Sequence, residues 1–160
     1  MTTSSNQCFV WKWLRGQSEP VVVGRLTIDE TGQHFTYGQS YLKRSDAEPI
    51  YSNELPLSAG TKEPVQGMPI FSCLRDAAPD AWGRRVINSR LMDKDYDAEL
   101  DEMTYLMHSA SDRIGSLDFQ ESATEYFARS ADAATLEELY QASEIVGQGV
   151  SVCLIQRKMH

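Results

Sequence analysis

The first third of the chain carries three short apolar patterns that predict an antiparallel β-meander. Residues 8–15 (CFVWKWLR) alternate, residues 21–28 are rich in β-branched side chains, and residues 33–37 alternate again. Turn-forming residues separate the runs at 16–20 and 29–32. The third run places Phe35 and Tyr37 on one face, and we expect that face to pack against helices.

The first predicted strand has no purely polar face. Cys8 and Val10 lie on one side of it, whereas Phe9, Trp11 and Trp13 lie on the other. Because large apolar side chains occupy both sides, we expect partial cover on both faces of this strand.

The middle of the chain predicts irregular but anchored structure. Residues 43–69 hold four of the six prolines, with Ser, Asn and Gly between them. Proline within a sheet is confined to edges, so we expect extended chain with one short edge strand at about 49–51. The expected apolar anchors of this segment are Ile50, Tyr51, Leu55 and Leu57.

Helical periodicity follows. We predict helices over about 70–77, 79–91 and 98–109, a strand over 114–120, and a further helix that begins at Thr135. In the second helix, Trp82, Val86 and Ile87 are predicted to face inward and Arg84, Arg85 and Asn88 outward. The predicted buried stripe of the third helix is Leu100, Met103, Leu106 and Met107. The fold class is therefore α+β, a small antiparallel β-meander packed with several α-helices.

Composition limits the partners and the compartment. The chain has 160 residues and a net charge of −8, so a broad basic surface for direct nucleic-acid binding is not expected. No run of 18 apolar residues is present, which argues against a membrane span. The polar start MTTSSNQ does not resemble a signal peptide, and three scattered cysteines suit a reducing compartment. A cytoplasmic location is expected.

The sequence predicts no catalytic residue, no cofactor site and no metal site. It contains neither a Gly-x-x-x-x-Gly-Lys nor a Gly-x-Gly-x-x-Gly phosphate loop, and no His-Arg-Asp or Asp-Phe-Gly motif. Residues 93–97 begin like a calcium loop, but Ala98 and Thr104 stand where such a loop needs Gly and Glu. An enzyme that uses Cys73 as a nucleophile is an alternative without a supporting motif.

Five short blocks occur in a particular order along the chain. They are Gly24-Arg25-Leu26, Phe35-Thr36-Tyr37, Leu55-Pro56-Leu57, Pro79-Asp80 with Arg84-Arg85, and Asp112-Arg113-Ile114-Gly115-Ser116. In this order, over about residues 8–120, they resemble the amino-terminal subdomain of HipA-family serine/threonine kinase toxins. The resemblance implies a domain over residues 1–122. It also implies a C-terminal helix and tail over 123–160, where the family would lead into the kinase core.

The resemblance implies a non-catalytic module of a toxin–antitoxin system that acts by protein–protein binding. Its expected partners are the kinase core of a HipA-like protein, a HipB-type antitoxin, or both, without direct contact to nucleic acid or membrane. The alternative is a truncated, inactive remnant of the kinase toxin with no independent role, because residues 151–160 do not resemble the family. The candidate contact residues are Trp11, Trp13, Arg25, Asp80, Trp82, Arg84 and Arg85.

Asp80 and Arg84 stand four residues apart on the predicted helix, so an ion pair between them is geometrically available. Such a pair on the surface contributes little stability, whereas arginines and tryptophans are enriched in protein interfaces. Core packing of the tryptophans and a partner-binding patch both remain open at this point.

Overall fold

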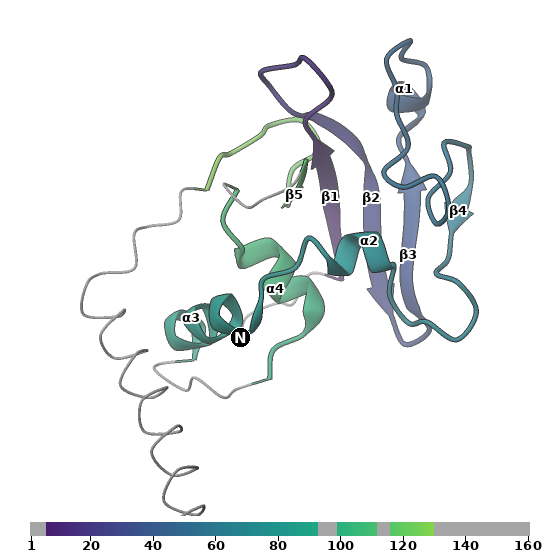
Figure 1. Ribbon diagram of the computed structural model, residues 1–160. Coiled ribbons are helices and arrows are strands. Elements are labelled where there is room, and N and C mark those ends of the chain that lie inside the picture. Colours follow the sequence, from purple (N-terminus) through teal and green to yellow (C-terminus); the bar gives the residue numbers. More distant parts are fainter. Residues whose placement is uncertain (1–5, 93–98, 112–115, 130–160) are drawn as a thin grey trace, which may run out of the picture. The chain divides into compact units, whose positions relative to one another are not determined.

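The computed structural model describes residues 6–92, 99–111 and 116–129, which belong to one compact unit that reaches Arg129 (Figure 1). The helix predicted from Thr135, the tail, and the calcium-like loop at 93–98 lie outside the described residues.

A five-stranded antiparallel sheet organises this unit, as the meander pattern predicted. Its strands are β1 (Gln7–Lys12), β2 (Val21–Asp29), β3 (Gly32–Tyr37), β4 (Thr61–Lys62) and β5 (Leu117–Gln120). Their order across the sheet is β4-β3-β2-β1-β5, so β5 returns to pair with the first strand. The α+β fold class is confirmed.

Cross-strand register assigns the two faces of the sheet. Leu26 lies opposite both Cys8 and Phe35, and these residues form one row of the core face. A bulge shifts the register between Val10 and Trp11, so Trp11 pairs with Val22. Because Val10 is fully buried on the core face and Trp11 is 7% exposed on the outer face, the predicted cover on both faces of β1 is confirmed.

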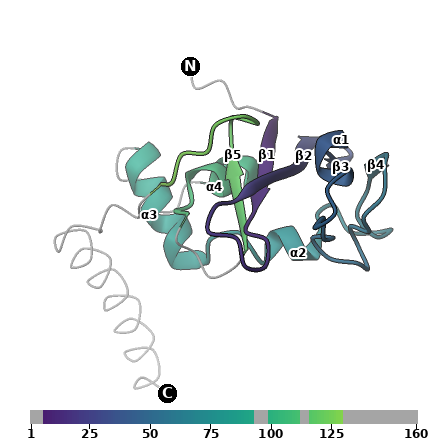
Figure 2. The ribbon, with the colours of Figure 1, turned by 90° about the horizontal axis from the view of Figure 1, so that it is seen from above.

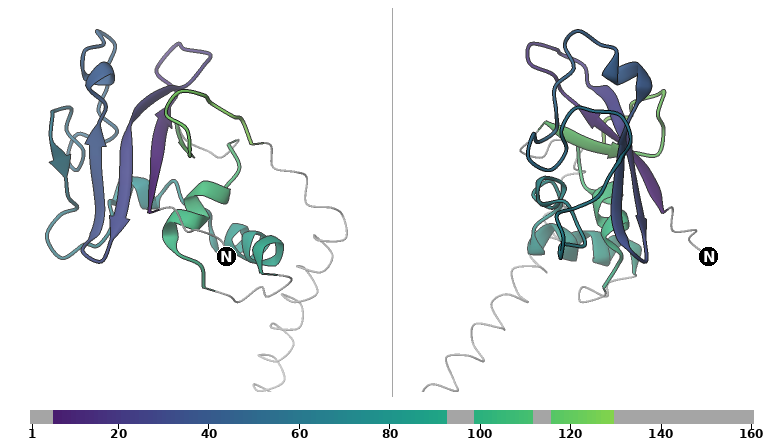
Figure 3. Two further views of the ribbon diagram at one scale, coloured as in Figure 1. Left: turned by 180° about the vertical axis from the view of Figure 1, so that it is seen from behind. Right: turned by 90° about the vertical axis from the view of Figure 1, so that its right-hand side faces the viewer.

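Four helices accompany the sheet in the described part of the chain: α1 (Gln39–Leu42), α2 (Ser72–Arg75), α3 (Ala81–Leu91) and α4 (Glu102–His108). The helix predicted over 70–77 is thus shorter, and α1 was not predicted. Met103 and Leu106 of α4 are buried in the core, as expected. Figure 2 shows α4 against the β1–β5 half of the sheet, with α3 packed on α4, and Figure 3 shows β4 at the end away from α3.

The short edge strand is in a different place from the one predicted. The structure puts it at 61–62, where Lys62 pairs with Phe35 and Thr61 pairs with Thr36. In the predicted segment 49–51, only Tyr51 is paired, through an isolated bridge to Leu55. The prediction at 49–51 was wrong because the Tyr37 hydroxyl accepts from the Ile50 amide at 2.9 Å and takes the place of a strand partner.

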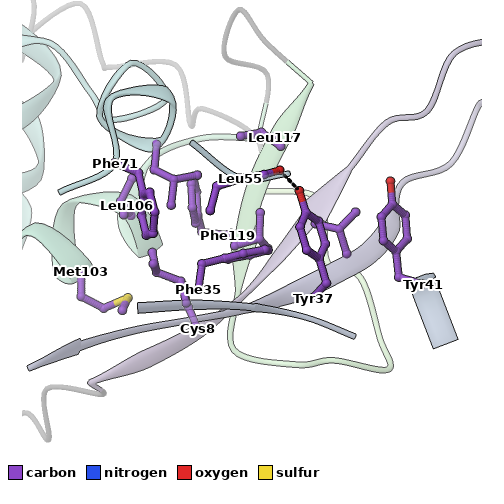
Figure 4. Packing of buried hydrophobic residues seen from close by; sticks show 14 of the residues in the cluster. Cys8, Phe35, Tyr37, Tyr41, Leu55, Phe71, Met103, Leu106, Leu117 and Phe119 are labelled. Atoms are coloured by element: carbon purple, nitrogen blue, oxygen red, sulfur yellow. Dashed lines mark hydrogen bonds between the residues drawn. The ribbon is translucent and has the colours of Figure 1, made fainter. Parts of the chain in front are cut away.

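Tyrosine hydroxyls tie the irregular segment to the sheet. Tyr37 donates to the Leu55 carbonyl at 2.6 Å (Figure 4). Tyr41 donates to the Glu48 carbonyl at 2.8 Å. On the core face, the buried ammonium group of Lys12 lies 3.1 Å from the Glu48 carboxylate. These contacts satisfy buried polar groups in a stretch that has little backbone pairing of its own.

The core itself is contributed by all parts of the unit. Leu55 is fully buried as predicted, whereas Tyr51 and Leu57 are 44% and 37% exposed, so two of the four expected anchors lie at the surface. The largest fully buried side chains include Phe35, Tyr37, Tyr41, Phe71, Phe119, Leu26, Leu55, Leu74 and Leu106 (Figure 4).

A glycine substitution tests this packing. A Cβ atom at Gly24 would lie 2.4 Å from the Thr36 carbonyl oxygen and 2.5 Å from Cζ of Phe35. We therefore expect Gly24→Ala to lower the free energy of unfolding by about 1–3 kcal/mol in urea denaturation. The matched control is Gly38→Ala, whose Cβ would meet nothing closer than 3.8 Å. Equal stability of the two variants would contradict the packing described for β2 and β3.

Candidate functional site

A polar clamp fixes α3 on α4. The Arg84 guanidinium donates to both carboxylate oxygens of Glu102, at 2.7 and 3.1 Å, and lies over the Tyr105 ring at 4.4 Å from its centroid. The Tyr105 hydroxyl donates to the side-chain oxygen of Asn88 at 2.9 Å. We call these four residues the α3–α4 clamp. A bidentate arginine–carboxylate pair stacked on an aromatic ring sets the orientation of both helices.

The clamp corrects two sequence predictions. Arg84 pairs with Glu102 rather than with Asp80, and Asn88 is buried although it was predicted to face outward. Asp80 instead caps α3, because its carboxylate accepts from the Gly83 amide at 2.8 Å. The predictions failed because the inward side of α3 is polar and finds its partners on α4.

The opposite side of α3 is partly open to solvent. Trp82 was predicted to point inward, but it is 46% exposed, and Arg85 is exposed beside it. Val86 and Ser89 share this side at helical spacing and are half-buried. We call these four residues the α3 outer face. It combines a large aromatic ring with a cation on a helix that the clamp holds in place.

The two tryptophans of the β1 segment are covered by the chain itself. We call residues 121–129 the strap. Tyr126 of the strap packs its ring against Trp11 and Trp13, with centroid distances of 5.4 and 5.5 Å. The indole nitrogen of Trp11 donates to the Ser122 carbonyl at 3.0 Å. The strap therefore provides the outer-face cover that the sequence required for this strand.

A buried carboxylate holds the strap. Asp118 on β5 is fully buried, and its carboxylate accepts from Ser111 at 2.6 Å, from Gln120 and Tyr126 at 2.9 Å, and pairs with Arg129. We call these five residues the Asp118 cluster. Desolvation alone would raise the pKa of Asp118, but the Ser111 hydrogen bond, the Arg129 charge and the other donors hold it below its usual value.

Sequence reasoning did not find the Asp118 cluster. An aspartate on a short edge strand is ordinarily solvent-exposed, and its partners Ser111 and Arg129 stand in segments without regular structure. The proximity of Asp118 and Arg129 in the sequence carried no recognisable motif.

Arg25 is exposed on the outer face of the sheet, between Phe9 and Thr36 in the cross-strand register. The α4 helix packs on the other face, where the core lies. The structure therefore separates the seven candidate contact residues into two groups. Asp80, Trp82, Arg84 and Arg85 belong to the start of α3, and Trp11, Trp13 and Arg25 belong to the β1–β2 side.

The described cysteines lack a nucleophile's environment. Burial raises the pKa of the Cys8 thiol to about 12. Burial, together with a hydrogen bond and the charge of Glu54, raises the pKa of Cys73 to about 12 as well. Both thiols stay protonated at neutral pH, which argues against the Cys73 enzyme alternative. Within the described ranges, no group of three or more His, Cys, Asp or Glu side chains is placed to hold a metal ion.

Comparison with known proteins decides the family. Residues 17–120 match the model of the HipA N-terminal domain, and this range runs from the turn before β2 to the end of β5. The chain belongs to the HipA N-terminal domain family. The matched domain is not the catalytic kinase core of HipA proteins. Neither the curated proteins nor the solved structures contain a significant match. None of the helices in the described part of the chain is long and apolar enough to span a membrane.

Two parts of the described unit lie outside the matched residues. β1 lies between β2 and β5 in the sheet, although it precedes the matched residues, and the strap follows them. The Asp118 cluster therefore links the last strand of the family segment to chain beyond it.

The Asp118 cluster can be tested by substitution. We expect Asp118→Asn to lower the free energy of unfolding by about 2 kcal/mol, because Arg129 loses its buried counter-charge. The loss is smaller than for a fully buried pair, since the Arg129 side chain is 28% exposed. The control is Asp46→Asn, which removes an exposed pair with Arg44 and should leave the stability close to that of the parent.

The same cluster predicts a pH dependence. A carboxyl whose pKa is lowered by folding stabilises the folded state above its unfolded pKa of about 3.9, and this stabilisation is lost as the pH falls through the lower folded pKa. Urea unfolding between pH 6 and pH 3 should therefore show a steeper loss of stability for the parent than for Asp118→Asn. Parallel pH profiles would show that the Asp118 carboxylate does not have this role.

Proposed function

We propose that this HipA N-terminal domain is a non-catalytic module of a HipA-like serine/threonine kinase toxin in a toxin–antitoxin system, and that it acts by protein–protein binding. Family membership supports the link to HipA proteins. The proposed partners are the kinase core of a HipA-like protein, a HipB-type antitoxin, or both, and the proposed location is the cytoplasm.

The α3 outer face is the observation that carries this proposal. Tryptophan and arginine are the residue types that contribute most to protein interfaces when they lie together in a contact. Trp82 remains 46% exposed although the unit has a well-filled core elsewhere, and Arg85 lies one turn further along the same side. A partner that covers the exposed part of this indole gains apolar burial.

The α3–α4 clamp makes this face suitable for binding. Arg84 and Asn88 on the inward side of α3 are held by Glu102 and Tyr105, so the helix does not need to order when a partner arrives. A surface that is already rigid loses less conformational entropy on binding. In this proposal, Arg84 is a positioning residue of the surface, and Trp82 and Arg85 make the contacts.

The test is binding of the full chain to a purified HipA-like kinase core and, separately, to a HipB-type antitoxin, by calorimetry. We expect Trp82→Ala to weaken the productive interaction by about tenfold to a hundredfold, and Arg85→Glu by at least about tenfold. Both variants should unfold like the parent, because both side chains are exposed.

The matched control is Phe127→Ala, which removes another exposed aromatic side chain, 61% exposed and located in the strap. Retained affinity in this variant together with loss in Trp82→Ala would support the α3 outer face. Equal losses in the two variants, or no binding of the parent to either protein, would refute the proposal. Stabilisation of the chain by Mg·ATP in a thermal melt would contradict a non-catalytic module.

A further inference from the structure

A second surface lies on the outer face of the sheet, beside the strap. It is an open groove of about 320 Å³ between the strap and α1. Phe9 and Val22 form its apolar walls, and Thr36 and Ser40 also line it. Ala123 of the strap borders it, and Arg25 contributes the cation.

Register explains how these groups come together. Phe9 on β1, Arg25 on β2 and Thr36 on β3 are cross-strand partners, so their side chains form one row across the outer face. The row is fixed by backbone pairing in the centre of the sheet, and it therefore does not depend on loop positions.

Arg25 is the unusual member of the row. Within residues 6–92, 99–111 and 116–129, no hydrogen bond or ion pair of its side chain occurs, whereas the described Arg44, Arg84 and Arg129 each have a carboxylate partner. An arginine in a chain of net charge −8 has many possible acidic partners, yet this guanidinium lies beside apolar walls. Charge complementarity calls for an anionic group on whatever occupies the groove.

We propose that this groove binds an extended segment of a protein partner in which an apolar side chain stands next to a carboxylate. The apolar side chain lies against Phe9 and Val22, and the carboxylate accepts from the Arg25 guanidinium. Ser40 also lines the groove, and the Thr36 hydroxyl, which shares a hydrogen bond of 3.2 Å with the Thr61 hydroxyl, has capacity for one more hydrogen bond to the segment's backbone. A groove of this size accommodates one or two side chains. Only one or two residues of the segment therefore enter the groove, and the rest of the segment lies outside it.

This site is separate from the α3 outer face, because the groove opens on the face of the sheet opposite to α4 and the core. A partner that binds α3 and a segment that binds the groove do not compete, and each surface can be removed by substitution without the other. The groove proposal can therefore be tested independently of the proposed function.

The experiment is a nuclear magnetic resonance titration of the ¹⁵N-labelled full chain with two capped tetrapeptides, Ac-Gly-Leu-Asp-Gly-NH₂ and its uncharged counterpart Ac-Gly-Leu-Asn-Gly-NH₂. We expect the acidic peptide to shift the amides of Val22, Arg25, Thr36 and Ser40 with a dissociation constant of about 1 mM, and to leave α3 unchanged. The uncharged peptide should bind about tenfold more weakly, because a charge-assisted hydrogen bond is lost.

Two variants make the result specific. Arg25→Gln should reduce the affinity for the acidic peptide about tenfold. Ala123→Glu should reduce it by a similar factor, because it places a negative charge at the rim that repels the carboxylate of the peptide. The matched control is Arg75→Gln, which removes the same charge from α2 on the core side of the sheet and should leave the affinity unchanged.

Three outcomes would overturn the proposal. They are equal affinity for the two peptides, an equal loss in Arg75→Gln and Arg25→Gln, or the same amide shifts with sodium acetate alone at equal concentration. The last result would show that the groove takes a small anion rather than a peptide segment. Because Trp82→Ala leaves the groove intact, a failure here is distinguishable from a failure of kinase or antitoxin binding.

Discussion

The pairing of Asp118 with Arg129 under the outer face of the sheet is the interaction on which much of the remaining structure depends. A fully buried carboxylate is costly unless its oxygens are satisfied, and here four side chains and one backbone amide satisfy them. Because two of those side chains belong to the strap, satisfying Asp118 also draws Tyr126 over Trp11 and Trp13. The charge, the strap and the tryptophan cover therefore form one unit, whose loss would expose an aromatic surface.

The α3–α4 clamp applies the same principle on the other side of the molecule. There, too, a polar network occupies a position at which a simple pattern would place apolar side chains, and it directs Trp82 and Arg85 outward. Both networks are made by arginines that bind carboxylates, and both determine which aromatic side chains remain available for contact. In this HipA N-terminal domain, the buried polar networks thus determine which aromatic side chains lie at the surface.

The sequence predicted those elements whose burial follows from the local pattern of apolar and polar residues. Strands β1, β2 and β3 follow from alternation and β-branched residues, and Met103 and Leu106 follow from helical spacing. Prediction from the sequence failed where a residue on another element determines the burial or the pairing of a side chain. Asn88 is buried where the Tyr105 hydroxyl of α4 donates to its side-chain oxygen. The short edge strand lies at 61–62, whereas near Ile50 the Tyr37 hydroxyl accepts from the backbone amide in place of a strand partner. The candidate residues on α3 were found, but their orientation depended on α4 and could not be predicted from α3 alone.

Both edges of the sheet have a feature that bears on assembly. At one edge, β4 is two residues long and carries Lys62, whose ammonium group binds the carbonyls of the preceding turn. At the other edge, the Phe119 amide of β5 donates to the Asp118 carboxylate at 2.8 Å. A two-residue edge strand that carries a lysine is a poor template for strand addition. At the β4 edge, a partner would therefore have to recognise side chains, which makes contact there sensitive to single substitutions and disfavours edge-to-edge joining of copies of the domain.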